Sequence, residues 1–443
     1  MYELLNSLSS FIWGPFTLTL ILGTGIYLSL GLKGFTFTYI IEAFKHIFSK
    51  NNKSEEGEIS SFQSLMTALS ATVGTGNIAG VATAIYIGGP GAIFWMWVSA
   101  LFGMATKYTE AFLAIKYRQK NSHGEVVGGP MYYIKNGLSG RFVFFAYLFA
   151  LSGMIAAFGI GNAVQVNSVS QVISNEFHAS ELVVGFVIAF FVGLVILGGI
   201  KSIGKITSRL VPVMSAIYVL GGLIIILVNH DQVGYVFNLI ITSAFTSTAA
   251  TGGFAGATVW MALRYGVARG VFSNEAGLGS SPIAHAAAKT DNPVKQGMIS
   301  MLEPLIDTLV VCTITAFIIL MSNLWIGDLN GAALTAASFN ELWVNGKYIV
   351  ISGLILFAFS TIIGWSYYGE KCAEFLFGSD VKQLYRIIWV AIIPLGATIE
   401  LNLIWLIADI MNGMMALPNL IALVLLGSVV FVKTNHLKGT FKA

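Results

Sequence analysis

The stretch that decides the fold is TVGTGN at positions 72–77, where two glycines and an asparagine interrupt a long apolar segment. Residues 62–106, which contain it, carry no charged side chain. Each glycine in a helix interior costs roughly 0.5–1 kcal/mol relative to alanine. In a lipid bilayer, loosened backbone is tolerated only where it is buried in protein or lines a cavity. The stretch therefore predicts a membrane-crossing helix with a break, and such breaks point to binding sites in membrane carriers.

The composition of the chain is that of a polytopic membrane protein. Of its 443 residues, 56% are hydrophobic and only 10% are charged, whereas about 25% are charged in a soluble protein. A hydrocarbon core of about 30 Å needs about 20 apolar residues per helix, and charge-free stretches of that order recur. The first is too long, and lacks the basic start, for a signal peptide, so we expect it to be a span. These stretches are 4–32, 62–106, 142–174, 182–200, 210–229, 308–327, 348–369 and 410–432.

The basic residues predict the orientation of the chain. Of the 24 Lys and Arg residues, 21 fall in six loops, and opposite loops such as 88–91 and 175–180 carry none. Loops rich in Lys and Arg stay in the cytoplasm. The N-terminus then lies outside and the C-terminus inside, so the number of spans is odd, and about eleven transmembrane helices fit best. The six basic loops are 33–60, 107–141, 200–209, 287–296, 370–388 and 433–443.

The helices can be placed approximately from the apolar stretches and the turn residues. Residues 233–256 are apolar but rich in Ser, Thr and Gly, and we interpret them as an extracellular or re-entrant connector. The last helix is expected to be one crossing that is interrupted at Asn412-Gly413 and at Pro418. We expect helices at 11–32, 62–87, 91–117, 141–174, 181–199, 207–229, 257–286, 296–323, 348–374, 383–399 and 401–433.

A second glycine cluster, NEAGLG at 274–279, interrupts the expected helix 257–286. Without the helix at 11–32, two sets of five helices remain, and each set begins with an interrupted helix. An odd number of helices per set inverts the second set relative to the first, which is the pattern of an inverted repeat. The alternative is that these glycines only pack at close helix contacts. The predicted all-α fold comprises an extra N-terminal helix with a cytoplasmic connector (1–60), a first repeat (61–232), the connector (233–256) and a second repeat with a cytoplasmic tail (257–443).

Three long motifs resemble one family of membrane carriers. They are TALSATVGTGNIAG at 67–80, GGPGAIFWMWVSALFG at 88–103 and GVFSNEAGLG at 270–279. On these motifs the chain resembles the alanine/glycine:cation symporter family, also called sodium:alanine symporters, of the amino acid–polyamine–cation superfamily. The resemblance covers nearly the whole chain. It implies a prokaryotic plasma-membrane carrier that couples entry of Na+, less often H+, to uptake of alanine or glycine through a five-plus-five inverted repeat.

The two breaks suit a small amino acid zwitterion. Where helix 62–87 unwinds, the amides of Thr75 and Gly76 are freed at the positive end of the following half-helix and can bind a carboxylate. The ammonium needs oxygens, and the second break can supply the carbonyls of Phe272 and Ser273 and the side chain of Asn274. No Lys or Arg is required, which suits a ligand that must also leave.

Two cation sites follow from resemblance. The sodium-coupled neurotransmitter-type transporters have a similar Val-Gly-x-Gly-Asn bend, so Asn77 is expected to line the pocket or a first cation site. The resemblance also implies a second site for Na+, the coupling ion. The alternative for its serine and threonine is hydrogen bonding within their own helix turn. The implied Na+ ligands are the carbonyls of Ser70, Val73 and Phe357 and the hydroxyls of Ser360 and Thr361.

Two further side chains are candidates for the substrate site. Trp365 lies one turn beyond Thr361, where its ring would cap a pocket sized for a methyl group; the alternative is an interfacial anchor. Gln165 lies in a charge-free helix and either contacts the substrate or ties helices together. Four intramembrane acids are expected to pair with basic residues or to cap freed backbone rather than to carry protons. These acids are Glu275, Glu303, Asp307 and Asp409.

Other function classes are disfavoured by the sequence. GTGNIA at 74–79 fits a dinucleotide fingerprint, but it follows no expected strand and residues 94–103 contain no acidic partner. GIKSIGKI at 199–206 lacks the final Ser or Thr of a P-loop. No HExxH motif or nucleophile elbow is present, so we do not expect an enzyme, and we expect no nucleic-acid partner. A carrier for glutamine, serine or D-alanine stays open, as does a passive channel, and we expect a functional monomer in the lipid bilayer.

Overall fold

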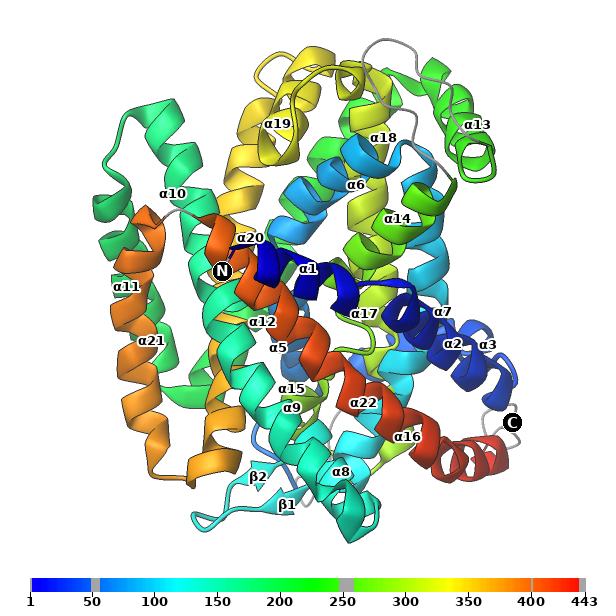
Figure 1. The fold of residues 1–443 in the computed structure, drawn as a ribbon, viewed down its shortest axis with the longest axis vertical. Coiled ribbons are helices and arrows are strands. Elements are labelled where there is room, and N and C mark those ends of the chain that lie inside the picture. Colours follow the sequence, from blue (N-terminus) through cyan, green and yellow to red (C-terminus); the bar gives the residue numbers. More distant parts are fainter. Residues whose placement is uncertain (1, 49–55, 247–258, 400, 438–443) are drawn as a thin grey trace.

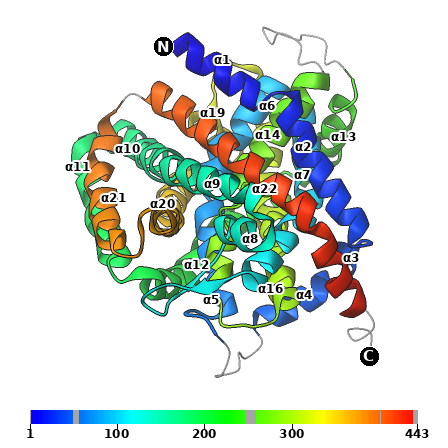
Figure 2. The same cartoon turned by 60° about the horizontal axis from the view of Figure 1, so that its bottom comes forward.

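The computed structural model describes residues 2–48, 56–246, 259–399 and 401–437, and these residues form a helical bundle (Figure 1). Helices α13 and α19 lie at one end of the bundle, and α8 with a short hairpin lies at the other. In both views α11 and α21 lie side by side at one edge, and α22 lies across α9 (Figures 1 and 2). The two strands of the hairpin, β1 (Gln119–Lys120) and β2 (Val126–Val127), pair antiparallel.

The N-terminal region differs from the expected single helix at 11–32. The chain forms two helices because Gly14 adopts an extended conformation and Pro15 starts a new helix. The first of them packs on α22, where Trp13 Nε1 donates to the backbone carbonyl of Asp409 at 3.0 Å. The helices are α1 (Tyr2–Ile12), α2 (Pro15–Gly31), α3 (Phe35–Thr38) and α4 (Ile40–Ile47).

The next region contains the first expected break, and its helices largely match the expected ranges. The basic segment 200–209, expected as a loop, belongs to a helix that begins at Gly199, a residue with a φ of 66°. Part of the connector 233–256 is the helix α13, and residues 247–256 of the connector lie outside the described residues. The elements are α5 (Ser61–Thr72), η1 (Gly76–Gly80), α6 (Val81–Gly88), α7 (Gly91–Lys116), α8 (Pro130–Gly137), η2 (Gly140–Phe142), α9 (Val143–Ala156), η3 (Ala157–Ala163), α10 (Val164–Phe177), α11 (Glu181–Ile196), α12 (Gly199–Val228), η4 (His230–Gln232) and α13 (Val233–Ser243).

The last region corrects the expected interruption of the final helix. α22 is continuous through Asn412, Gly413 and Pro418. A Cβ at Gly413 would lie 2.1 Å from the side chain of Ile12, so this glycine allows close packing of α1 rather than a break. The elements are α14 (Val259–Asn274), α15 (Pro282–Ala286), α16 (Pro293–Ser300), α17 (Leu302–Pro304), η5 (Leu305–Cys312), α18 (Thr313–Ser322), η6 (Leu324–Ile326), α19 (Gly331–Leu342), α20 (Lys347–Phe377), α21 (Val381–Thr398) and α22 (Leu401–Leu437).

Six helical segments of the described chain are long and apolar enough to cross a membrane, and the bent pair α5 and α6 makes a seventh. The expected number of about eleven spans therefore stays a prediction. At 16 residues, for example, α11 is too short to be counted by length, although it is apolar. The six segments are 3–31, 140–177, 199–228, 293–322, 347–377 and 406–436.

The end of the bundle that carries the hairpin is held by an ion-pair cluster. Glu125 bonds Lys382, and Asn121 Nδ2 donates to Glu374 Oε1 at 2.6 Å. Lys371 and Glu374 pair at 2.7 Å. Burial raises the pKa of Glu125, but the hydrogen bonds from Lys382 and Asn121 outweigh burial and bring this pKa to about 2. The hairpin is thus fixed to α20 and α21 by charged groups at any physiological pH.

Candidate functional site

The first expected break is present between α5 and α6. α5 ends at Thr72, Val73 is extended, and the helix axes on the two sides differ by 52°. A Cβ at Gly74 would lie 2.6 Å from Thr361 Oγ1, so glycine is what allows α20 to approach the break. The freed Gly74 amide donates to Asn77 Oδ1 at 2.8 Å. The local sequence therefore opens the helix and caps the opening with its own asparagine.

The second expected break follows α14. Its backbone reverses through three residues of positive φ, namely Glu275 (56°), Gly277 (91°) and Gly279 (81°), before α15 begins. Such angles favour glycine and explain two of the cluster's glycines. Asn274 Oδ1 accepts a hydrogen bond from the Ala276 amide at 3.0 Å, so Asn274 caps this break as Asn77 caps the first.

Asp307, on η5, joins the two breaks. Its Oδ1 accepts from Asn77 Nδ2 at 2.6 Å, and its Oδ2 accepts from the hydroxyls of Ser273 and Thr308, each at 2.8 Å. Asn274 Nδ2 donates to Thr308 Oγ1 at 3.1 Å. All five side chains are fully buried. Within the described part of the chain, the hydrogen-bond partners of the Asp307 carboxylate are all neutral, so the site joins a buried acid to oxygen ligands that suit a hard cation or a proton.

The residues implied for the second Na+ site also lie together. Ser360 Oγ donates to the carbonyls of Phe357 at 2.8 Å and Ser70 at 3.2 Å. Thr361 Oγ1 donates to the carbonyl of Val73 at 3.5 Å. All five residues are buried. The hydroxyl of Ser360 therefore bonds within its own turn, as the alternative expected, and also across to α5, and its role as an ion ligand stays a prediction.

A cavity of about 280 Å³ lies beside the first break and is lined by Thr75 and Phe272, among others. In the part of the chain that the structure describes, the buried hydroxyl of Thr75 has no hydrogen-bond partner. The Thr75 amide donates to Gln165 Oε1 at 3.4 Å, which places Gln165 at the break. A Cβ at Gly76 would lie 3.3 Å from the ring of Phe272. Thr75 and Phe272 therefore line the cavity with Gln165 and Gly76 next to them, whereas Asn77, Ser273 and Asn274 are directed to the Asp307 cluster.

Trp365 lies against the second break. Its Nε1 donates to Glu275 Oε1 at 2.9 Å, and its side chain packs on Gly161, where an added Cβ would lie 2.2 Å from the Cβ of Trp365. It is buried and is not among the residues that line the 280 Å³ cavity. Its expected role as a cap over the substrate therefore stays a prediction.

A separate buried network lies around Glu303. Lys107 Nζ pairs with Glu303 Oε2 at 3.0 Å, and His285 Nε2 is 2.6 Å from Glu303 Oε1. Lys107 also donates to Ser281 Oγ at 2.8 Å, next to the second break. The expected pairing of Glu303 with a basic residue is confirmed. Although Glu303 and Asp307 are four residues apart, η5 begins between them, and they belong to different networks.

Arg269 is a site residue that the sequence reasoning left unassigned. It lines the 280 Å³ cavity together with Phe272, and its guanidinium lies 5.6 Å from the centre of the Phe272 ring. The charge pattern of the sequence could have indicated Arg269, because Arg264 and Arg269 are two of the three basic residues outside the six basic loops. A basic residue within a span is a functional candidate by default.

The comparison with known families decides the class of protein. Residues 1–443 match the model of the sodium:alanine symporter family. The chain belongs to this family. The sodium/alanine symporter AgcS of Methanococcus maripaludis is 53% identical to this chain over 440 residues, which cover 98% of this chain and 96% of AgcS. The probable sodium/glutamine symporter GlnT of Bacillus subtilis is 40% identical over 430 residues, which cover 95% of this chain and 87% of GlnT.

Solved structures share the fold of this chain at low sequence identity. The crystal structure of MhsT in complex with L-phenylalanine matches with a TM-score of 0.57 at 12% identity, covering 86% of this chain and 99% of MhsT. A substrate-bound, outward-open Na+-coupled sialic acid symporter matches with a TM-score of 0.56 at 12% identity, covering 95% and 97%. The family and the long apolar helices make the chain an integral membrane transporter, and the predicted family resemblance is confirmed.

Proposed function

We propose that the chain is a secondary active symporter that takes up small neutral amino acids, alanine and glycine, with Na+ by alternating access. The observation that carries this proposal is the meeting of the two broken helices at Asp307, through Asn77 and Ser273. A break that is held by buried polar side chains, next to a cavity, fits a binding site in the middle of a membrane protein.

The substrate binds at the wall of the first break. The amides of Thr75 and Gly76 receive the carboxylate, and the carbonyls of Phe272 and Ser273 receive the ammonium. Gln165 now accepts from the Thr75 amide, so it is the side chain that a carboxylate displaces first. Asn274 holds the second break, and Trp365 limits the size of the substrate from behind Glu275.

Na+ binds at two places that the first broken helix connects. At the second site, rotation of the hydroxyls of Ser360 and Thr361 moves their hydrogens away from these carbonyls and turns oxygen lone pairs toward an ion that the carbonyls of Ser70, Val73 and Phe357 also contact. At the first, the Asp307 carboxylate binds the ion, and the Asn77 side-chain oxygen, which now accepts from the Gly74 amide, turns toward it. A hard cation favours such oxygen ligands. Because each site takes some of its ligands from the first broken helix, binding of the ions organises the substrate site.

The membrane arrangement follows the charge pattern. Residues 61–232 and 257–443 form two inverted repeats, preceded by the extra N-terminal unit 1–60 and joined by the connector 233–256. The chain crosses a prokaryotic plasma membrane about eleven times, with its N-terminus outside and its C-terminus in the cytoplasm. Each repeat starts with one of the broken helices, and the self-contained unit works as a monomer.

Counterflow in proteoliposomes tests the proposal. We expect the purified protein to exchange radiolabelled alanine for unlabelled alanine and glycine when Na+ is present and to stop when choline replaces Na+. Undiminished exchange in choline at fixed pH contradicts Na+ coupling and directs attention to H+. Currents at ion-channel rates contradict the carrier function altogether.

The panel of substrates resolves the remaining alternatives. GlnT is described as a probable sodium/glutamine symporter, so a relative of this chain differs in substrate. One methylene of pocket space is worth only about 1–3 kcal/mol, so alanine, glycine, serine, glutamine and D-alanine belong in one experiment. Stronger exchange with glutamine than with alanine assigns the pocket to the larger substrate.

A further inference from the structure

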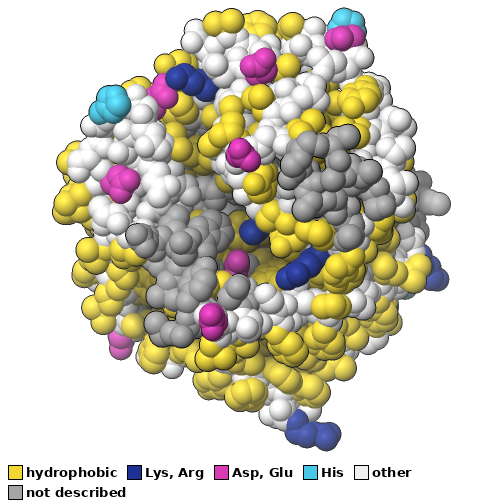
Figure 3. Space-filling model, turned by 45° about the horizontal axis from the view of Figure 1, so that its top comes forward, with side chains coloured by type: hydrophobic (Ala, Val, Ile, Leu, Met, Phe, Trp, Pro, Cys, Tyr) yellow, Lys and Arg dark blue, Asp and Glu magenta, His cyan; other side chains and the backbone are white. Residues whose placement is uncertain are grey.

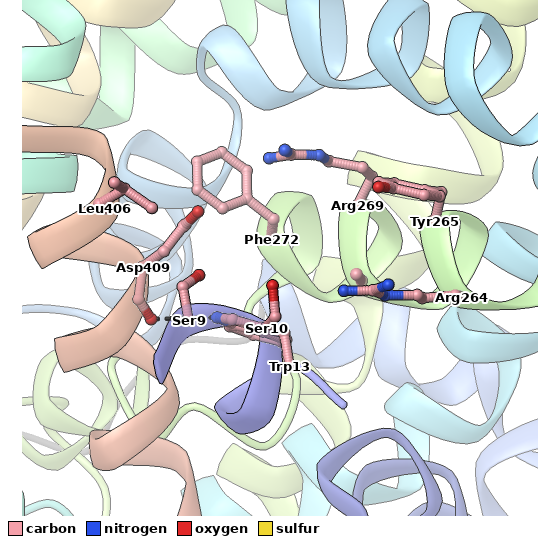
Figure 4. Close-up of a pocket in the computed structure, with 10 residues that line it drawn as sticks. Ser9, Ser10, Trp13, Arg264, Tyr265, Arg269, Phe272, Leu406 and Asp409 are labelled. Atoms are coloured by element: carbon pink, nitrogen blue, oxygen red, sulfur yellow. Dashed lines mark hydrogen bonds between the residues drawn. The ribbon is translucent and has the colours of Figure 1, made fainter. Parts of the chain in front are cut away.

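A second cavity, of about 230 Å³, lies outside the substrate wall, between α1, α14 and α22. The end of the bundle that carries α13 and α19 is hollowed, and side chains of both charges are visible in the hollow (Figure 3). The cavity is lined by Arg264 and Arg269 from α14, by Asp409 from α22 and by Ser9 and Ser10 from α1 (Figure 4). Charged groups of opposite sign thus face one space.

These charges do not form an ion pair with one another in the described part of the chain. In the described part of the chain, neither arginine and no oxygen of the Asp409 carboxylate takes part in an ion pair. The arginines lie on aromatic rings instead, Arg264 at 5.6 Å from the centre of Tyr265 and Arg269 at 5.6 Å from that of Phe272. Partly buried charges without a partner are costly unless water or a ligand compensates them.

The outer cavity shares a wall with the 280 Å³ cavity. Arg269 and Phe272 line both of them, whereas Asp409 lines only the outer one and Thr75 only the inner one. In Figure 4 the ring of Phe272 lies between the guanidinium of Arg269 and the carboxylate of Asp409. A ligand in the outer cavity is therefore one side chain away from the proposed substrate site.

We propose that the outer cavity is a second binding subsite for a zwitterionic α-amino acid, occupied before the substrate passes Phe272. Arg269 binds the carboxylate, because a guanidinium offers two parallel donors to a carboxylate. Asp409 binds the ammonium. The inference rests on the proposed function, since it takes the transported amino acid as the ligand.

The pair of charges selects this class of ligand over a simple ion. An inorganic anion can bind the arginines but gains nothing from Asp409, and a metal cation is repelled by two guanidinium groups. An amino acid satisfies both signs at once. The subsite is expected to bind more weakly than the inner site, because its charged groups are only partly buried and stay partly hydrated.

Equilibrium dialysis of radiolabelled alanine against the full chain in lipid nanodiscs tests the subsite. With Na+ present, the natural protein is expected to bind two alanine molecules per chain, the second at least about tenfold more weakly than the first. Asp409→Asn and Arg269→Gln are each expected to lose the second. Lys347→Gln is the matched control, because it removes a charge that pairs with Glu176 and lines neither cavity, and it is expected to keep both.

The outcomes separate the subsite from the proposed function. Saturation of the natural protein at one alanine overturns the subsite and leaves the symporter proposal standing, whereas no Na+-dependent binding at all contradicts the symporter itself. Asp409→Asn is folded if it keeps the first alanine, and Arg269→Lys is expected to keep a weakened second one. Propionate carries only the carboxylate and ethylamine only the ammonium. If propionate displaces the second alanine as effectively as unlabelled alanine does, while ethylamine does not displace it, the cavity binds an anion alone and the zwitterion proposal fails.

Discussion

At the scale of single residues, the site is built from neutral oxygen and amide groups around one buried acid. Asn77 has two tasks, since its oxygen caps the Gly74 amide and its nitrogen bonds Asp307. The resemblance of the sequence to a known family implied that Asn77 matters and that Ser360 and Thr361 approach α5. It did not reveal that Asn77 and Ser273 meet at Asp307, because that contact joins three segments that are distant in sequence and depends on packing.

Asn77→Ala is expected to abolish Na+-dependent alanine binding or to weaken it at least about tenfold, while the protein stays folded. The substitution leaves the Gly74 amide and one oxygen of Asp307 without a partner, which costs about 1–3 kcal/mol per buried group. Scintillation proximity binding measures the loss. Asn136→Ala, on the exposed surface of α8, is the control. If Asn77→Ala transports alanine as fast as the natural protein does, Asn77 only caps a half-helix.

Ser360→Ala is expected to raise the Na+ concentration required for half-maximal alanine uptake by at least about tenfold, because an ion ligand is removed. Ser366→Ala is matched to it: Ser366 lies on the same helix, is also buried, and donates to the Ile363 carbonyl within its own turn. Its Na+ requirement is expected to be unchanged. Equal effects of the two variants assign Ser360 to helix packing.

At the scale of the elements, the glycine clusters predicted both breaks, since a backbone that must open or adopt positive φ favours glycine. The same logic failed at Asn412 and Gly413, which lie in an unbroken helix. Composition cannot distinguish a glycine that opens a helix from one that admits a neighbour, as Gly413 admits Ile12. Likewise, the helix α19 was not expected, because its sequence carries few local signals of a helix. Its packing on η1, α18 and α20 stabilises it instead.

Gly74→Ala tests whether close approach at the first break supports the ion site. A Cβ at Gly74 would lie 2.6 Å from Thr361 Oγ1 and displace that hydroxyl, so Na+-dependent uptake is expected to fall at least about tenfold. At Gly23, on α2, nothing lies within 4 Å of a Cβ either, and Gly23 lines neither cavity, so Gly23→Ala is expected to transport normally. Proteoliposome uptake over a series of Na+ concentrations compares them. Normal Na+ dependence in the Gly74 variant means that Thr361 is not an ion ligand.

At the scale of the whole molecule, the charge pattern and the structure lead to one expectation about orientation. The hairpin end carries the ion-pair cluster of Glu125 and Lys382, and α19 lies at the opposite end (Figure 1). In the charge-based topology the hairpin faces the cytoplasm, because the loop 107–141 is rich in Lys and Arg. The cavity of Arg269 and Asp409 then opens outside, where substrate arrives.

Cysteine labelling of intact cells checks this orientation. Asn345, in the turn between α19 and α20, and His123, in the hairpin, are both exposed, whereas the natural Cys312 and Cys372 are buried. We expect Asn345→Cys to react with a membrane-impermeant maleimide in intact cells and His123→Cys to react only after the cells are opened. The natural chain is the control for background labelling. The reverse pattern places the hairpin outside, and in that case the outer cavity becomes an exit subsite from which the amino acid leaves toward the cytoplasm.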